Sequence, residues 1–229
     1  MNMQIATPDL GLADPKISAT LDRLHEDAKK DRWVFLRALP AVALSMLRGR
    51  PAIEGALPHL KDAYIPVDAD QGAMLYVTAR AIRARNIVEF GTSFGISTIY
   101  LATAARANGG RVTGTELESK KVNVARANVA RAGLAQFVDV LEGDAMKTLA
   151  NVEQPIDLLL LDGWKDIYLP MIRMLTPKLR AGAVVLADNI FTFKKTLRPY
   201  VRHMKDRANG FESVTLPLGH GMEYSVRLN

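Results

Sequence analysis

The fold is indicated most clearly by residues 86–116, which read NIVEFGTSFGISTIYLATAARANGGRVTGTE. Apolar and β-branched residues predict strands at Asn86–Phe90 and Arg111–Glu116, and the pattern between them predicts a helix over 97–107. A strand, a helix and a second strand in this order form the unit from which parallel sheets are built. We therefore expect an α/β protein.

The same alternation continues toward the C-terminus. The remaining predicted elements are a helix at 119–132 and strands at 137–141, Ile156–Leu161, 183–187, Phe211–Leu216 and Met222–Arg227. The run IDLLLL at 156–161 is apolar throughout, as in strands buried on both faces. The Gly-His-Gly sequence at 219–221 predicts a hairpin between the last two strands. We expect an open, seven-stranded, mostly parallel sheet with helices on both faces and an antiparallel C-terminal hairpin.

The first third of the chain is predicted to be helical. Asp14 is a favoured helix N-cap, and Pro15 suits the first helical position. Further helical stretches are predicted at 33–39, where Pro40 ends the pattern, and at 41–47. Apolar residues recur at helical spacing at Ile17, Leu21, Leu24 and Ala28. We expect a helical cap over 1–66, followed by the α/β domain over 67–229.

The composition excludes several protein classes. The chain has 48% hydrophobic and 24% charged residues, which is ordinary for a globular protein. It has no cysteine, which excludes disulfides, thiolate zinc sites, iron–sulfur clusters and a cysteine nucleophile. No apolar run approaches ~18 residues, so no transmembrane helix is expected. The N-terminus lacks the features of a secretory signal, and we expect a cytoplasmic protein.

The net charge of +6 raises nucleic acid as a partner. The charges are spread along the chain, and a solvated helix face is the preferred interpretation of the densest basic cluster. That cluster comprises Lys194, Lys195, Arg198, Arg202, His203, Lys205 and Arg207.

Ligands of parallel α/β sheets bind beyond the carboxyl ends of the strands, so the residues there are the candidates for a site. After the first strand, Gly91 and Gly95 would let the backbone approach a ligand, although a plain turn would look the same. The spacing differs from that of a dinucleotide-binding loop. Glu89 would repel a pyrophosphate but suits a cationic amino-acid ligand.

Acidic residues follow the next two strands. Glu116 is placed to accept the hydroxyls of a ribose. A helix N-terminal carboxylate is the alternative, but Glu118 could serve that purpose equally well. Asp144, after the third strand, could hold an adenine edge or act only as a helix N-cap, and the sequence leaves this open.

Two further strand ends carry Asp162, Asp188 and Asn189. Two carboxylates and an amide carbonyl suit a hard cation such as Mg²⁺. Asp188 and Asn189 alone would fit a polar turn, but Asp162 at the neighbouring tip favours the cation. Lys165 follows Asp162 by three residues, which suits a general base, with a surface lysine as the alternative.

The segments VEFGTSFGIS (88–97), LLLLDGWKDIYLP (158–170) and GAVVLADNI (182–190) resemble the cation-dependent S-adenosylmethionine O-methyltransferases, close to catechol O-methyltransferase. The resemblance runs from Val67 to Arg227. It implies a Rossmann-like class I methyltransferase fold and an enzyme that methylates a hydroxyl of a small phenolic, catechol-like molecule. A tRNA hydroxyl methyltransferase of the same family is the alternative. In this family N-terminal segments cap the pocket or form a homodimer contact.

The resemblance also implies the roles of single residues. Lys165 would take the proton from the acceptor hydroxyl, and Asp162, Asp188 and Asn189 would hold Mg²⁺ or Mn²⁺. The residues expected to bind S-adenosylmethionine are Val67, Glu89, Gly91, Ser93, Gly95, Ser97, Glu116, Asp144, Ala145, Asp162 and Trp164, with Ala145 and Trp164 flanking the adenine.

Two positions depart from the catechol enzyme. Gly163 stands where that enzyme has a histidine beside the cofactor, which should alter the packing of the adenine. Val214 stands where it has a carboxylate that touches the second substrate hydroxyl. The second departure concerns the identity of the substrate more than the reaction.

Overall fold

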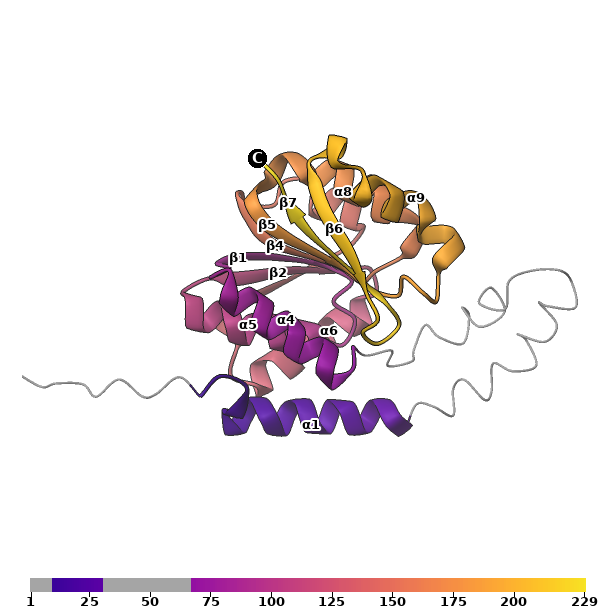
Figure 1. The fold of residues 1–229 in the computed structure, drawn as a ribbon. Coiled ribbons are helices and arrows are strands. Elements are labelled where there is room, and N and C mark those ends of the chain that lie inside the picture. Colours follow the sequence, from indigo (N-terminus) through magenta and orange to yellow (C-terminus); the bar gives the residue numbers. More distant parts are fainter. Residues whose placement is uncertain (1–9, 31–66) are drawn as a thin grey trace, which may run out of the picture.

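The computed structural model describes residues 10–30 and 67–229 (Figure 1). The helices predicted at 33–39 and 41–47 lie outside these residues. In the described part, no helix is long and apolar enough to cross a membrane.

A single seven-stranded sheet organises the chain, in the order β3-β2-β1-β4-β5-β7-β6. The first five strands run parallel, and β7 pairs antiparallel with both β5 and β6, as predicted. The strands are β1 (Asn86–Phe90), β2 (Arg111–Glu116), β3 (Val138–Glu142), β4 (Ile156–Leu161), β5 (Leu179–Ala187), β6 (Phe211–Leu216) and β7 (Met222–Arg227). β5 begins four residues earlier than predicted, and its register with β4 shifts between Ile156 and Leu158.

Helices cover both faces of the sheet (Figure 1). The α-helices are α1 (Pro15–Lys30), α4 (Ala69–Ala81), α5 (Ile96–Asn108), α6 (Ser119–Arg131), α7 (Ala145–Thr148), α8 (Tyr168–Leu175) and α9 (Lys194–Lys205). Short 3₁₀ helices lie at Gly11–Ala13, Ala135–Phe137, Lys165–Ile167, Thr176–Lys178 and Arg207–Asn209. Helices α1, α4, α5 and α6 cover one face, and α8 and α9 cover the other.

Two hydrophobic cores result, one on each face. Leu158 and Leu160 of β4 belong to the first core, and Leu159 and Leu161 belong to the second. Successive side chains of a strand point to opposite faces, so a strand with a core on each side is apolar throughout. This explains the continuous apolar run that predicted β4.

Helix α1 packs against the domain, as its predicted apolar spacing requires. Ile17, Leu21 and Leu24 are buried in the same core as residues of α4 and α5. Arg23 donates a hydrogen bond to Asn128 of α6 at 2.7 Å. His25 Nε2 lies 3.1 Å from the hydroxyl of Tyr100 on α5.

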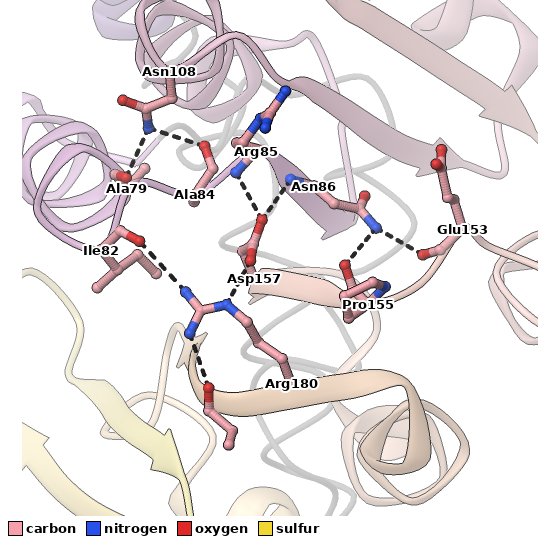
Figure 2. A network of polar contacts seen from close by, with 11 residues as sticks. Ala79, Ile82, Ala84, Arg85, Asn86, Asn108, Glu153, Pro155, Asp157 and Arg180 are labelled. Atoms are coloured by element: carbon pink, nitrogen blue, oxygen red, sulfur yellow. Dashed lines mark hydrogen bonds and ion pairs between the residues drawn. The ribbon is translucent and has the colours of Figure 1, made fainter.

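A polar network closes the edge of the sheet at the amino ends of its strands (Figure 2). The Asp157 carboxylate accepts hydrogen bonds from the backbone N–H groups of Arg85 and Asn86, at 2.7 and 2.8 Å, and from Arg180 Nε at 2.5 Å. Burial raises the pKa of Asp157, but these hydrogen bonds outweigh it and leave the pKa below its usual value. The network ties β1, β4 and β5 together at the edge opposite the candidate site.

The basic cluster lies on α9. This helix buries Leu197, Tyr200 and Met204 and exposes most of its cations, as expected of a solvated helix face. Arg207, which follows α9, pairs with Glu212 at 2.6 Å.

Candidate functional site

The loops after β1 and β4 touch at the carboxyl edge of the sheet. Gly91 has φ +97°, and a Cβ built on it would lie 2.5 Å from the backbone nitrogen of Gly163. Only glycine fits such a conformation and such a close approach. Gly95 also has a positive φ, of +87°, and caps the N-terminus of α5. The structure thus places Gly91 against the loop after β4, whereas Gly95 packs against Ala125 of α6.

Glu89 is buried at the end of β1 and accepts three hydroxyl hydrogen bonds. The donors are Ser97 at 2.6 Å, Thr98 at 2.5 Å and Thr92 at 3.2 Å. Burial, together with the charge of Asp162, raises the pKa of Glu89 to about 7, although the three hydroxyl hydrogen bonds oppose this. Glu89 and Ser97 were predicted together, whereas Thr92 and Thr98 were missed. The hydroxyl residues crowded into GTSFGIST are the signal that could have revealed them.

Glu116 connects the end of β2 to the loop after β1. Its carboxylate accepts hydrogen bonds from the backbone N–H groups of Ser93 at 2.9 Å, Leu117 at 2.8 Å and Glu118 at 3.0 Å. Two predicted cofactor residues, Glu116 and Ser93, are therefore in direct contact. Glu118 is the N-cap residue of α6, but its side chain makes no capping hydrogen bond.

The predicted adenine residues lie at the next strand ends. Asp144 accepts a hydrogen bond from the N–H of Met146 at 2.9 Å, so it does cap α7. Ala145 beside it is buried. Trp164, after β4, is 52% exposed, so much of its indole is open to a ligand. The roles of these residues toward adenine stay predictions.

Lys165 is a largely buried lysine and not a surface one. Its side chain is 12% exposed, and Nζ lies 3.0 Å from Asp162 Oδ1. Nζ also donates a hydrogen bond to the hydroxyl of Tyr168 at 2.9 Å. The ring of Phe193 lies on another side, with its centroid 5.9 Å from Nζ. The lysine is thus held at the tip of β4.

Tyr168 was not predicted as a site residue. Its hydroxyl accepts the hydrogen bond from Lys165 and lies 3.5 Å from the backbone oxygen of Asp188. Burial, with the charges of Asp162 and Asp188, raises its pKa well above the usual value, so the phenol stays protonated. The spacing Lys-x-x-Tyr in one turn of the chain is the signal that could have found it.

Asp188 is almost fully buried at the end of β5. Its Oδ1 accepts hydrogen bonds from Gln71 Nε2 at 2.8 Å and from the backbone N–H of Asn189 at 2.7 Å, and Oδ2 accepts from Asn189 Nδ2 at 3.2 Å. Burial, together with the nearby charge of Asp162, raises the pKa of Asp188 to about 7, although the charge of Lys165 opposes this. Asn189 has φ +66°, a conformation that asparagine tolerates better than most residues.

The donor set at these two strand ends fits a hard cation. Within residues 10–30 and 67–229, no three His, Cys, Asp or Glu side chains lie together as possible metal ligands. The candidate ligands are therefore the carboxylates of Asp162 and Asp188 and the amide of Asn189. Burial raises the pKa of Asp162 too, against the effect of Lys165. Lys165 forms its ion pair with Asp162 and acts on Asp188 only through its charge, so a divalent cation would balance the excess negative charge of the two carboxylates.

The segment that precedes α4 completes this edge. Val67 is buried, and Asp68 caps the helix. Gly72 lies against the ring of Tyr100, because a Cβ on Gly72 would come within 2.2 Å of that ring. Val67 was predicted to cover the cofactor, and this role stays a prediction.

Comparison with known proteins places this geometry in a family. A sequence family described as a methyltransferase domain matches residues 88–190, which include Glu89, Glu116, Asp162 and Asp188. A protein of Mycobacterium tuberculosis named catechol O-methyltransferase is 40% identical over 144 residues, 61% of this chain and 65% of that protein. A protein of Niastella koreensis with the same name is 33% identical over 153 residues, 64% of this chain and 69% of that protein.

The chain belongs to the S-adenosylmethionine-dependent O-methyltransferase family. The matched stretch spans about two thirds of each of these two relatives. The fold of the family is confirmed by the cofactor-bound crystal structure of Rv0187 from MTB, which has 29% identity and a TM-score of 0.69 and covers 86% of this chain and 90% of that one.

The structure accounts for the first of the two departures from the catechol branch of the O-methyltransferase family. A Cβ on Gly163 would lie 2.3 Å from the ring of Phe90, so the phenyl group occupies the space beside residue 163. Val214, the second departure, is 52% exposed on β6. Its neighbours Ser213 and Thr215 both donate hydrogen bonds, at 2.5 Å, to the buried Glu223 on β7.

Proposed function

We propose that this protein transfers a methyl group from S-adenosylmethionine to a hydroxyl of a small catechol-like molecule and that it needs Mg²⁺ or Mn²⁺. The observation that carries the proposal is the position of Lys165. It is a largely buried lysine between Asp162 and Tyr168, beside the second carboxylate of the candidate cation site. A lysine so placed at a strand end of this fold is suited to proton transfer.

Lys165 would receive the proton of the acceptor hydroxyl at Nζ. Asp162, at 3.0 Å, would then stabilise the resulting ammonium group, and the Tyr168 hydroxyl would fix its direction. A divalent cation held by Asp162, Asp188 and Asn189 would acidify a catechol hydroxyl by acting as a Lewis acid. The side chains of Asp162 and Lys165 are largely buried, which would keep this exchange away from bulk water.

The loop after β1 would hold the methyl donor. When bound, S-adenosylmethionine would supply an electrophilic methyl group whose bond to sulfur breaks as the bond to oxygen forms. Glu116 would accept the ribose hydroxyls, since three N–H groups already fix its carboxylate. Glu89 would orient Ser97 toward the methionine end. Fixed alignment of the reacting groups can supply ~7–11 kcal/mol.

The test is a methyl-transfer assay with catechols, flavonoids and hydroxycinnamates, with and without chelator. We expect methylated catechols, no turnover in chelator and recovery with Mg²⁺ or Mn²⁺. Asp162→Ala and Asp188→Ala should lose activity and the response to metal together. Full turnover in chelator would instead identify a metal-independent methyltransferase.

A tRNA hydroxyl is the second candidate acceptor, favoured by the exposed face of α9. Lys194, Lys195, Arg198 and Arg202 have no ion-pair partner among the described residues. Bulk tRNA belongs in the same assay, at two salt concentrations. An RNA acceptor would lose affinity steeply as salt rises, whereas a neutral diphenol would not.

A further inference from the structure

Gln71 lies at the junction of three segments that the sequence alone does not connect. It is 1% exposed, on the first turn of α4. Its Oε1 accepts a hydrogen bond from the Asp68 N–H at 3.1 Å, and its own N–H donates to Asp68 Oδ1 at 2.7 Å. Its Nε2 donates to Asp188 Oδ1 at 2.8 Å. Both ends of the amide are therefore engaged, one by the helix cap and one by a candidate cation ligand.

The hairpin loop between β6 and β7 holds this amide in place. A Cβ built on Gly219 would lie 2.4 Å from Gln71 Cδ, so the loop backbone packs directly on the amide. The same loop accepts hydrogen bonds from the residues that follow Asp188 and Asn189: Ile190 N–H donates to Gly221 at 2.9 Å, and Phe191 N–H to His220 at 2.9 Å. The loop therefore fixes Gln71 and the chain after β5 relative to each other.

These contacts decide which oxygen of Asp188 can meet a cation. Oδ1 has two donors, Gln71 Nε2 and the Asn189 N–H. Among the described residues, Oδ2 has a single donor, the side chain of Asn189, the third predicted ligand, at 3.2 Å. With Oδ1 fixed from two sides, the carboxylate plane is set and Oδ2 stays beside Asn189. A glutamine can do this without charge, whereas a lysine would compete with the cation.

We infer that Gln71 is a positioning residue that holds the Asp188 carboxylate in the orientation needed to bind the divalent cation. The inference rests on the proposed cation dependence and extends it to a residue outside the ligand set. Residues that hydrogen-bond to metal ligands typically change metal affinity 10–100-fold when removed. The capping box alone would give Gln71 a purely structural role, so the test must separate the two roles.

The experiment measures Mn²⁺ affinity by electron paramagnetic resonance on the full chain, without cofactor or acceptor. Gln71→Met keeps the length and burial of the side chain but removes its donor and acceptor. Asp68→Ala is the matched control, because it removes the side-chain half of the capping box, the bond from the Gln71 N–H to Asp68 Oδ1, and leaves the contact of Gln71 with Asp188. We expect Gln71→Met to bind Mn²⁺ about 10–100-fold more weakly and Asp68→Ala to stay within about twofold of the parent.

Thermal unfolding of each variant, followed by circular dichroism, checks the fold. If Gln71→Met does not fold, Gln71→Asn replaces it, because the shorter amide stays polar but cannot reach Asp188. Equal Mn²⁺ affinity in the parent and the folded Gln71 variant overturns the inference and leaves the proposed function standing. An equal loss in Asp68→Ala also overturns it. If the parent itself binds no Mn²⁺, the proposed cation dependence and this inference both fail.

Discussion

The ring of Phe90 lies directly over Gly163, where a Cβ would come within 2.3 Å of the phenyl Cζ. The ring makes an edge-on contact with Tyr168, with centroids 6.1 Å apart. A large residue at position 90 is thus matched by the absence of a side chain at position 163. The glycine that departs from the catechol enzyme is, in this structure, a packing partner of Phe90 next to Asp162.

This pairing predicts that Gly163→Ala destabilises the protein. Forcing a methyl group into a filled site typically costs about 1–3 kcal/mol. Phe90→Leu alone should also destabilise, because it removes ring contacts. The double variant should lose less stability than the sum of the losses in the two single variants, because the smaller side chain at position 90 makes room for the methyl group added at position 163. Urea unfolding of all four proteins measures this coupling, and simple additivity would show that the two positions do not share space.

Lys165→Ala should slow the chemical step. Removal of a general base typically costs ~10²–10⁴ in rate. Cofactor and Mn²⁺ affinities should stay close to those of the parent, and raising the pH should restore part of the rate because more of the acceptor hydroxyl ionises unaided. Single-turnover kinetics test this, with Lys29→Ala on the exposed side of α1 as control. Equal rates for Lys165→Ala and the parent at neutral pH would leave Lys165 without a role as base.

Glu116→Ala should weaken S-adenosylmethionine binding by about 1.5–3 kcal/mol, the value of hydrogen bonds to a charged group. The contact with Ser93 adds a second effect, because the loop after β1 loses an anchor. Glu116→Gln keeps one oxygen for that N–H and should bind more tightly than Glu116→Ala. Calorimetry without metal measures both. Unchanged affinity in Glu116→Ala would mean that the ribose binds elsewhere.

Asp157→Asn should destabilise the protein at neutral pH by about 1–3 kcal/mol, since it removes hydrogen bonds to a charged group. The pKa of Asp157 is lowered in the fold, so its stabilisation is present above the unfolded pKa, near 3.8, and is lost as the pH falls through the folded pKa. The difference in free energy of unfolding between Asp157→Asn and the parent should therefore shrink in acid.

The control for Asp157 is Asp139→Asn. The ion pair of Asp139 with Arg111 is about half exposed, and such pairs contribute less than about 1 kcal/mol. Denaturant unfolding between pH 3 and pH 7 compares the two variants. If the free energy of unfolding of Asp157→Asn stayed below that of the parent by the same amount from pH 3 to pH 7, the lowered pKa of Asp157 would not be the source of its stabilisation.

The sheet was predictable because its signal is local. Alternation of β4 residues between two cores makes the strand apolar throughout, and this is visible in the sequence. The start of β5 was missed because Arg180, Ala181 and Gly182 do not show the apolar pattern of a buried strand. Position 182 has φ +73°, close to the register shift between β4 and β5.

The candidate site was predictable where side chains follow strands directly, as at Asp162 and Asp188. Gln71 was not predictable, because its contact with Asp188 spans 117 positions and depends on how α4 packs beside β5. Tyr168 was missed because its role depends on the burial that brings its hydroxyl to Lys165.

The packing of α1 has a practical consequence for anyone who shortens this protein. Ile17, Leu21 and Leu24 share one core with Leu75 and Ile99, although the recognisable methyltransferase sequence begins only at Val67. A version trimmed to that recognisable part would lack α1 and would expose Leu75 of α4 and Ile99 of α5 to water. Such apolar surfaces promote aggregation. Expression of the catalytic part alone should therefore give insoluble material, and a chain that keeps α1 should not.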